Sequence, residues 1–341
     1  MTDRAILQKR FIAETDWAGA MVAPLAGDAS NRRYLRLTRA ATGETAVLMD
    51  APPEKGEDVR PFVRIARYLT DIGLSAPRIF AADQAHGFLI LEDLGDALYA
   101  RVIPLDPGLE MPLYGAATDL LAELHRHSPP IGLATYGPDV MADMAALAFD
   151  WYHRGTTGDI GTARPAFHAS IKTALKTHAD TADVLIQRDY HAENLIWLPD
   201  REGVARVGLL DFQDAMLGHR AYDLVSVLQD ARRDVPHDIQ EAMISRYIAA
   251  SGADPTAFKT AYHCLGAQRN LRILGVFVRL CLRDGKAHYI DLIPRVWAHL
   301  ERDLTDPAMA PVAEIIRDTL VPPTPDVLQR LKDQCARNAS R

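Results

Sequence analysis

The sequence predicts an α+β protein with a small, β-rich N-terminal lobe and a large, mostly helical C-terminal lobe. Strand-like apolar runs crowd the first 95 residues, helical periodicity dominates the remainder, and three short apolar runs interrupt the helical region near its middle. The chain has 341 residues, a length that suits two units of ordinary size. We place the lobes at residues 1–95 and 96–341.

Four strands and one helix are expected in the N-terminal lobe. In order, they are strands at 32–39 and 44–50, a helix at 58–73, and strands at 76–83 and 88–94. The turn-like ATGE joins the first two strands, and the dipeptide HG joins the last two. Asp58 can cap the start of the helix, and Gly73 can end it.

The C-terminal lobe begins with a buried helix at 111–127, whose apolar residues recur on one stripe. The helical pattern continues, less distinctly, over 134–180. The runs VLIQRD, NLIWLP and RVGLLDF then predict three short strands separated by polar turns. After Tyr222 the chain again has a helical pattern, with breaks before Pro236 and Pro255.

Composition excludes several classes of protein. The net charge of −7 argues against a general nucleic-acid-binding protein. We expect no membrane segment, because no run of about 18 apolar residues occurs, and no signal peptide, because the first residues lack an apolar region. Three widely spaced cysteines give no zinc or disulfide framework and favour a reducing cytoplasm. The oligomeric state is not indicated.

The stretch IQRDYHAENLIW gathers polar residues between two apolar runs. Asp189 follows the first run, Asn194 comes five residues later, and Asp211 follows the next pair of strands. A short loop and a hairpin can bring these side chains to one side of a cleft. An amide oxygen and a carboxylate are suitable ligands for Mg²⁺, which binds few protein groups. Phosphoryl transfer needs such ligands together with a carboxylate near the attacking hydroxyl. The alternative is that these residues merely cap turns.

The segments QRDYHAENLIW and LLDFQDAMLGHRAYDL together resemble the aminoglycoside phosphotransferase and choline kinase superfamily. The resemblance implies a protein-kinase-like two-lobe fold and an ATP-dependent small-molecule kinase. It implies that Asp189 is the catalytic base and that Asn194 and Asp211 bind Mg²⁺. His191 matches a frequent histidine of the catalytic loop, either structural or in contact with the substrate. Asp223 matches a carboxylate that braces this loop, whereas Gln187 stands where histidine is frequent.

The nucleotide is expected in the N-terminal lobe. Ser30 and Asn31 lie in the segment GDASN, whose backbone and hydroxyl groups can hold a phosphate, although an ordinary hairpin turn has the same composition. By the resemblance, the stretch that includes Glu92 and Leu94 offers backbone groups to adenine.

The resemblance also places Met49 where the fold usually has a phosphate-binding lysine. Some other cation should then neutralise the phosphates of the nucleotide. Arg32 and Arg33, beside GDASN, are the candidates for that role.

A narrower resemblance extends over roughly residues 25–300. GDASNRRYLRL, VLMDAPPEKGEDVRPF, ILEDLGD and QRNLRILGVFVRLCLRDGK are similar to the bacterial anomeric sugar kinases of cell-wall recycling. It implies phosphorylation of C1 of N-acetylmuramate or N-acetylglucosamine. The absence of the lysine is normal in that group.

A helix near 268–283 has a basic face, on which Arg272 and Arg279 are candidates for the substrate carboxylate. The alternative is a solvated face or internal ion pairs.

We therefore expect a cytoplasmic kinase that uses ATP and Mg²⁺ and phosphorylates an amino sugar, giving an α-1-phosphate. Three alternatives stay open. The first is another small-molecule kinase of the superfamily, acting on an aminoglycoside, choline or homoserine. The second is a nucleotide-binding module without turnover, which Met49 favours. The third, a protein kinase, is disfavoured because no activation segment follows Asp211.

Overall fold

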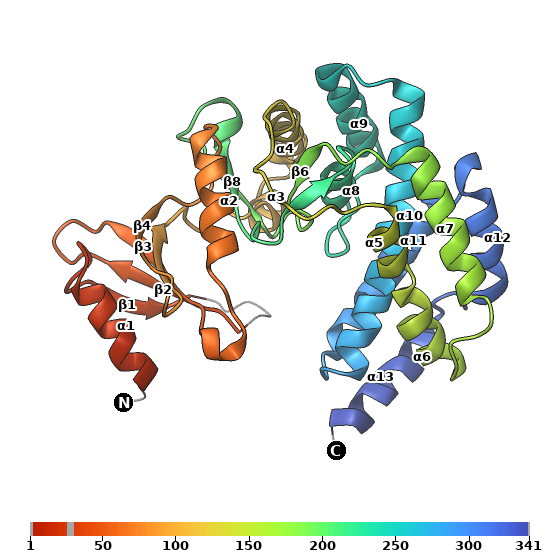
Figure 1. Cartoon of the computed structure of the whole chain (residues 1–341), viewed down its shortest axis with the longest axis horizontal. Helices are drawn as coiled ribbons and strands as arrows, with labels where there is room; N and C mark the ends of the chain where they lie inside the picture. Colours follow the sequence, from red (N-terminus) through yellow and green to blue (C-terminus); the bar gives the residue numbers. More distant parts are fainter. Residues whose placement is uncertain (1–2, 26–30, 340–341) are drawn as a thin grey trace. The chain divides into compact units, whose positions relative to one another are not determined.

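The structure, a computed structural model, describes residues 3–25 and 31–339, with side chains described up to Cys335 (Figure 1). Its residues group into two compact units. Unit 1 comprises Met1–Leu120 and Glu193–Ala215, and unit 2 comprises Leu121–Ala192 and Met216–Arg341. The bounds of these units do not test the predicted division into lobes, so the lobe boundary near residue 95 stays a prediction.

Unit 1 contains a five-stranded antiparallel sheet with the strand order β1-β2-β3-β5-β4. The strands are β1 (Met21–Pro24), β2 (Arg33–Thr38), β3 (Thr45–Asp50), β4 (Ile79–Asp83) and β5 (Phe88–Glu92). Both predicted hairpins, β2–β3 and β4–β5, are confirmed. The edge strand β1 was not predicted.

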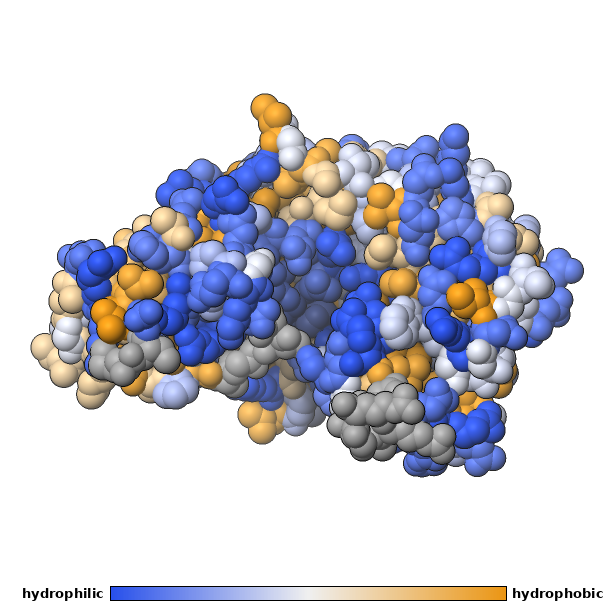
Figure 2. Space-filling view, turned by 60° about the horizontal axis from the view of Figure 1, so that its bottom comes forward, coloured by the Kyte–Doolittle hydropathy of each residue, from blue (hydrophilic) through white to orange (hydrophobic). Residues whose placement is uncertain are grey.

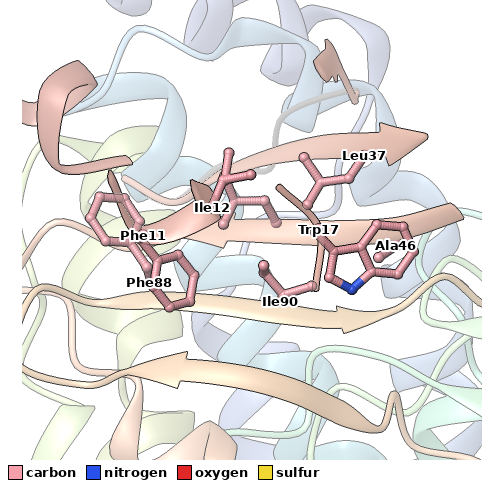
Figure 3. Close-up of a cluster of buried hydrophobic side chains, with 8 residues drawn as sticks. Phe11, Ile12, Trp17, Leu37, Ala46, Phe88 and Ile90 are labelled. Atoms are coloured by element: carbon pink, nitrogen blue, oxygen red, sulfur yellow. The ribbon is translucent and has the colours of Figure 1, made fainter. Parts of the chain in front are cut away.

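One face of the sheet packs against the N-terminal helix α1 (Asp3–Ala13), which was not predicted either. Figure 3 shows Phe11 and Ile12 of this helix against apolar side chains of the strands. The rings of Phe11 and Phe88 stack with their centroids 5.7 Å apart. Arg4 donates to the buried carboxylate of Asp50 at 2.6 Å, which attaches the start of the helix to β3. Side chains of the opposite sheet face are therefore left to line a cavity.

The predicted helix at 58–73 is confirmed as α2 (Arg60–Asp71). Asp58 accepts a hydrogen bond from the backbone N–H of Arg60 at 2.9 Å, and Gly73 follows the helix in a left-handed conformation with φ 84°. Unit 1 continues with α3 (Tyr99–Leu105), a 3₁₀ turn (Pro107–Leu109) and α4 (Glu110–Leu124), whose last residues belong to unit 2. The predicted apolar stripe of α4 is buried.

A further hairpin in unit 1 is formed by β7 (Leu195–Trp197) and β8 (Val207–Leu209). Ser75 forms a bridge with Gly208, and Leu98 forms one with Ile196. These contacts explain why residues 193–215 group with the first part of the chain. The strands predicted in NLIWLP and RVGLLDF are confirmed.

Unit 2 is mostly helical and is built around α10 (Pro255–Leu282), as Figure 1 shows. Its other helices are α5 (Pro138–Ala145), a π-helical stretch (Ala148–His153), α6 (Arg154–Thr157), α7 (Arg164–His178), α8 (Tyr222–Leu228), α9 (His237–Ser251), α11 (Ile293–Asp303), α12 (Ala310–Thr319) and α13 (Pro325–Ala339). Asp254 caps α10 by accepting from the N–H of Ala257 at 2.8 Å. The predicted breaks before Pro236 and Pro255 are confirmed.

A small two-stranded sheet in unit 2 pairs β6 (Val184–Ile186) with β9 (Met216–Gly218). The strand in VLIQRD was predicted, and its partner was not. The strand β6 leads directly into the polar stretch that contains Asp189.

The surface shown in Figure 2 mixes hydrophilic residues with small groups of hydrophobic ones. Scattered apolar residues are normal on a globular surface and do not by themselves mark a docking face. Of the helices in the described part of the chain, none combines the length and apolarity that a membrane span needs. Cys264, Cys281 and Cys335 are free and buried.

Unit 2 is expected to lose stability in acid because His125 and His191 are buried. Burial lowers the pKa of His125 to about 3 and that of His191 to about 4. Both values lie below the ~6.5 of an unfolded histidine. Their contribution to stability is therefore present above pH ~6.5 and is lost as the pH falls through the folded-state pKa values.

Urea unfolding at several pH values between ~7.5 and ~4.5 measures this effect as a falling free energy of unfolding. His125→Gln should weaken the pH dependence, whereas the exposed His178→Gln should leave it unchanged. Equal pH dependence in both variants would show that burial of His125 is not responsible.

Candidate active site

Asn194 and Asp211 lie at the same end of the β7–β8 hairpin. Leu195 pairs with Leu209, and the backbone N–H of Leu210 donates to the carbonyl of Asn194 at 3.0 Å. Asn194 immediately precedes one strand, and Asp211 follows the other by two residues. Both side chains are half-buried and line one cavity of unit 1. The hairpin therefore brings together the two predicted metal ligands.

Two residues at or next to the predicted catalytic and metal-binding residues have a strained backbone conformation. Among the described residues, Arg188 (φ 72°) and Asp211 (φ 57°) are the non-glycine residues with positive φ. Such conformations are unfavourable for side chains with a Cβ and persist where the surroundings impose them, often at functional sites. Arg188 directly precedes Asp189, and Asp211 is itself a candidate ligand. Phe212, the residue after Asp211, is buried, and its ring stacks on that of Phe62 of α2 with the ring centroids 4.9 Å apart.

The cavity has a volume of about 390 Å³ and combines an apolar wall with polar groups near the hairpin. Its apolar wall includes Val47, Met49, Phe62, Leu91, Leu94, Leu98, Ile196 and Leu210. Its polar residues include Tyr34, Arg36, Glu92, Asp93, Asp96, Arg101, Glu193, Asn194 and Asp211. An apolar slot with a few polar groups at one side suits a planar base carrying a charged tail.

The predicted adenine-binding residues Glu92 and Leu94 both line this cavity. The Glu92 carboxylate accepts from Arg201 at 2.8 Å and from Arg78 at 3.2 Å. Its side chain is therefore engaged by other residues of unit 1, and the role of this stretch in adenine binding stays a prediction.

Met49 lines the cavity, and an arginine that we did not single out lies on the same sheet face. In the ladder, Tyr34 is opposite Met49 and Arg36 is opposite Val47. The Arg36 guanidinium donates to Asp93 at 2.7 Å and to Asp96 at 2.9 Å. These carboxylates raise the pKa of Arg36, so it stays a cation. The cavity thus contains a charged guanidinium that is paired with two carboxylates and lies on the sheet face that carries Met49.

The other predicted nucleotide ligands lie before or at the start of β2. Arg32 pairs with Glu57 at 2.8 Å, and Arg33 pairs with Asp50 at 2.5 Å. The N–H of Asn31 donates to Glu57 at 3.2 Å. Neither arginine is among the residues that line the cavity. Ser30 lies outside the described residues, and the assignment of all four to the nucleotide stays a prediction.

In unit 2, the loop that contains Asp189 is held by Asp223 of α8. The Asp223 carboxylate accepts from the backbone N–H groups of Gln187 at 2.6 Å and Arg188 at 2.9 Å. Ser226, one turn further along, donates to the Arg188 carbonyl at 3.2 Å. The brace expected of Asp223 is therefore present, and it acts on the backbone. Burial raises the pKa of Asp223 to about 7, against the effect of the two N–H donors.

Gln187, at the position where the superfamily often has histidine, is buried. Its side-chain Nε2 has no hydrogen-bond partner in the described part of the chain. This amide nitrogen therefore adds no hydrogen bond to the one that the backbone N–H of Gln187 makes with Asp223.

Around Asp189, unit 2 places both cationic and neutral groups. Arg272 and the buried Arg269, on α10, both interact electrostatically with Asp189. Burial lowers the pKa of Arg272, but Tyr222, Tyr136 and Asp189 outweigh it and keep this arginine charged. His191 is buried and neutral near pH 7, as its lowered pKa shows.

Arg279, the second predicted substrate arginine, lies about two turns beyond Arg272 along α10. Its electrostatic neighbours are Arg283, Asp284 and Arg272, and its Nε has no hydrogen-bond partner among the described residues. The basic face expected on this helix is present, because Arg272 and Arg279 are half-buried while Leu274 and Val278 are fully buried.

Asn194 and Asp211 fit a magnesium ion. They supply an amide and a carboxylate oxygen in one cavity, and Gln213 donates to Asp211 at 2.7 Å, which orients the carboxylate. Within residues 3–25 and 31–339, no three His, Cys, Asp or Glu side chains gather as a closed metal site. Two protein ligands suit an ion that keeps several waters and binds substrate phosphates.

Comparison with known proteins decides the family. The family model described as the phosphotransferase enzyme family (APH) matches residues 22–261. The chain belongs to this family. The phosphotransferase is 39% identical to the N-acetylmuramate/N-acetylglucosamine kinase of Caulobacter vibrioides, in an alignment that covers 91% of this chain and 94% of the relative. It is 33% identical to the protein of the same name from Pseudomonas aeruginosa, with 91% and 92% covered.

Solved structures extend this result to the fold. The microcompartment-associated aminopropanol kinase covers 89% of the phosphotransferase and 99% of its own chain, with a TM-score of 0.60 and 17% identity. Aminoglycoside phosphotransferase structures match as well, one with a TM-score of 0.58. The protein-kinase-like α+β fold expected from the sequence is confirmed.

Proposed function

We propose that this phosphotransferase transfers the γ-phosphoryl group of Mg·ATP to the anomeric C1 hydroxyl of N-acetylmuramate and N-acetylglucosamine. The observation that carries the proposal is the near full-length similarity to relatives named as kinases of these two sugars. The product, a sugar 1-phosphate, suits the recycling of cell-wall sugars in the cytoplasm.

In the proposed reaction, Asp189 accepts the proton of the C1 hydroxyl. The sugar oxygen forms a bond to the γ-phosphorus, the bond from that phosphorus to the bridging oxygen breaks, and ADP leaves. An anomeric hydroxyl is more acidic than an ordinary alcohol, so a carboxylate is a sufficient base. Positioning and neutralisation of charge supply most of the rate gain.

Asn194 and Asp211 would hold magnesium through oxygen atoms in the cavity of unit 1. Bound there, the ion would offset charge on the β- and γ-phosphates. The apolar wall formed by Val47, Leu91 and Ile196 suits the adenine ring.

The cations of α10 support an anionic acceptor over a polycationic one. Arg272 lies within electrostatic reach of Asp189, and a guanidinium pairs well with a carboxylate such as the lactyl group of N-acetylmuramate. The positive charge of Arg272 would repel a polycationic aminoglycoside. His191 remains a candidate for contact with the sugar, and Arg279 a second candidate for its carboxylate.

A coupled assay of ADP release tests the substrate class. The panel contains N-acetylmuramate, N-acetylglucosamine, glucose, choline, homoserine and kanamycin, each with Mg·ATP. Turnover on the N-acetyl sugars above all others is the expected result. Turnover only on choline, homoserine or kanamycin would contradict the proposed substrate class but leave the proposed catalytic residues unaffected. Binding of ATP without any turnover would favour the alternative suggested by Met49, a nucleotide-binding module without catalytic activity.

Replacing Arg36 with alanine is expected to raise the KM for ATP by about tenfold and to lower stability. The variant removes the fixed cation of the cavity and leaves the nearly buried Asp93 carboxylate without this donor, which costs about 1–3 kcal/mol. Steady-state kinetics and thermal unfolding measure the two effects. Arg39→Ala, which removes a more exposed ion pair with Glu44, is the matched control. Equal KM values for ATP in the two variants would show that Arg36 does not contribute to nucleotide binding.

A further inference from the structure

The loop at 187–192 is held at its end as well as at its start. The backbone N–H of Ala192 donates to the carboxylate of Asp230 at 3.3 Å. The other oxygen of Asp230 accepts from the N–H of Arg232 at 2.8 Å. Asp189 lies between the two points of attachment, three residues before Ala192.

Both holding carboxylates project from the region of α8. Asp223 lies in the first turn of α8, and Asp230 follows it by seven residues along the chain. Ser226, which bonds the Arg188 carbonyl, lies between them. Asp230 comes just after the helix ends at Leu228, and it is only 1% exposed.

The position of Asp230 is itself fixed by a buried polar network at the preceding residue. Gln229 donates to Asp303 of α11 at 3.0 Å and accepts from Asn270 of α10 at 2.7 Å. Arg269 donates to the Gln229 carbonyl at 3.3 Å. Gln229, Asn270 and Asp303 are at most 1% exposed. The helices α10 and α11 thus hold the backbone from which Asp230 projects.

A buried carboxylate is an expensive way to stabilise a loop. Taking an ionised group out of water carries a large penalty, and an apolar side chain of similar size often stabilises a core equally well. A carboxylate only accepts hydrogen bonds, so what it provides is fixed directions for the N–H groups that it binds. At Asp230 the N–H groups so fixed are those of Arg232 and of Ala192, the last residue of the loop that carries Asp189.

We propose that Asp230 is a positioning residue for Asp189. It fixes the end of the loop through Ala192, as Asp223 fixes its start, and the network at Gln229 keeps it in place. The inference rests on the proposed function, in which Asp189 receives the sugar proton. A displacement of about 1 Å at a reacting group can lower a rate by about 100-fold.

Three variants test this role. Asp230→Ala removes the acceptor, Asp230→Asn keeps an oxygen that can accept from Ala192, and Asp234→Ala removes a nearby carboxylate in an exposed ion pair with Arg295. For each variant we would measure kcat, KM for sugar and ATP, thermal unfolding, and amide hydrogen exchange at Ala192 by mass spectrometry of short peptides.

Asp230→Ala is expected to lower kcat by about 10- to 100-fold with little change in either KM. Exchange at Ala192 should become about tenfold faster, while helices away from the loop keep their protection. Asp230→Asn should restore slow exchange at Ala192 and return kcat to within about threefold of the wild-type value. Asp234→Ala should match the wild type in all measurements.

Three results would overturn the proposal. The first is a wild-type kcat and unchanged exchange at Ala192 in Asp230→Ala. The second is a raised KM for the sugar at constant kcat, which would mean that Asp230 contacts the substrate. The third is loss of protection throughout unit 2, which would mean a purely structural role. If the wild type itself turns over no sugar, the proposed function fails, and exchange at Ala192 alone decides whether Asp230 holds the loop.

Discussion

Asp189→Asn is expected to lower kcat by about 10²–10⁴-fold and to leave the KM for ATP nearly unchanged. Asparagine has almost the same shape as aspartate but cannot accept the proton of the sugar hydroxyl. The loop should keep its conformation, because Asp223 holds it through the backbone N–H groups of Gln187 and Arg188. The measurement is steady-state ADP release with N-acetylglucosamine, with thermal unfolding as the check on folding.

Asp183→Asn is the matched control for this variant. Asp183 lies just before β6 in the same unit and pairs with Arg220 at the surface, where a single ion pair contributes about 0–1 kcal/mol. Its kcat should equal that of the wild type. A kcat for Asp189→Asn above about one tenth of the wild-type value would show that another group takes the proton.

Asp211→Asn is expected to lower kcat/KM by about 10²–10³-fold and to abolish the effect of magnesium on ADP affinity. Asparagine tolerates the left-handed backbone that Asp211 adopts at φ 57°, so the hairpin should stay intact. The change then removes charge from the ligand pair without disturbing the fold. Isothermal titration of ADP, with and without Mg²⁺, reports on the site independently of turnover.

The exposed Asp200, in the turn of the same β7–β8 hairpin, provides the control. Asp200→Asn should bind ADP more tightly with Mg²⁺ than without it, and we expect the same of the wild type. An equal magnesium effect in Asp211→Asn would place the metal on other ligands.

Local pattern predicted much of what positions the site. Alternation and turn residues predicted the hairpins β2–β3 and β4–β5, and apolar runs predicted β6, β7 and β8. The separation of Asn194 and Asp211 by a hairpin was enough to predict that they meet, because antiparallel pairing returns the chain to its starting point. The periodicity of α10 predicted the face that carries Arg272.

Elements held by distant partners were missed. The strand β1 has four residues, all exposed, with no alternation of burial, and it forms only because β2 offers an edge. The three-residue strand β9 pairs with β6, which lies about thirty residues earlier in the chain. The helix α1 is stabilised by the packing of Phe11 and by the pairing of Arg4 with Asp50. None of these partners is readable from the local sequence.

Two functional candidates were missed for different reasons. Arg36 had a signal, since alternation in RRYLRLT puts it on the same strand face as Tyr34, but the sequence does not say which face lines a cavity. Asp230 had none. It stands in the polar segment QDARRD, which is typical of a surface turn, and its burial depends on the packing of α10 and α11.

The most direct test of the proposed reaction is ³¹P NMR of the product formed from Mg·ATP and N-acetylglucosamine. The proposal predicts a new phosphomonoester signal coupled to the anomeric proton, which appears as the γ-phosphate signal of ATP declines and is absent with Asp189→Asn. A phosphoester coupled to the C6 protons, or inorganic phosphate and ADP as the sole new signals, would contradict transfer to the anomeric hydroxyl.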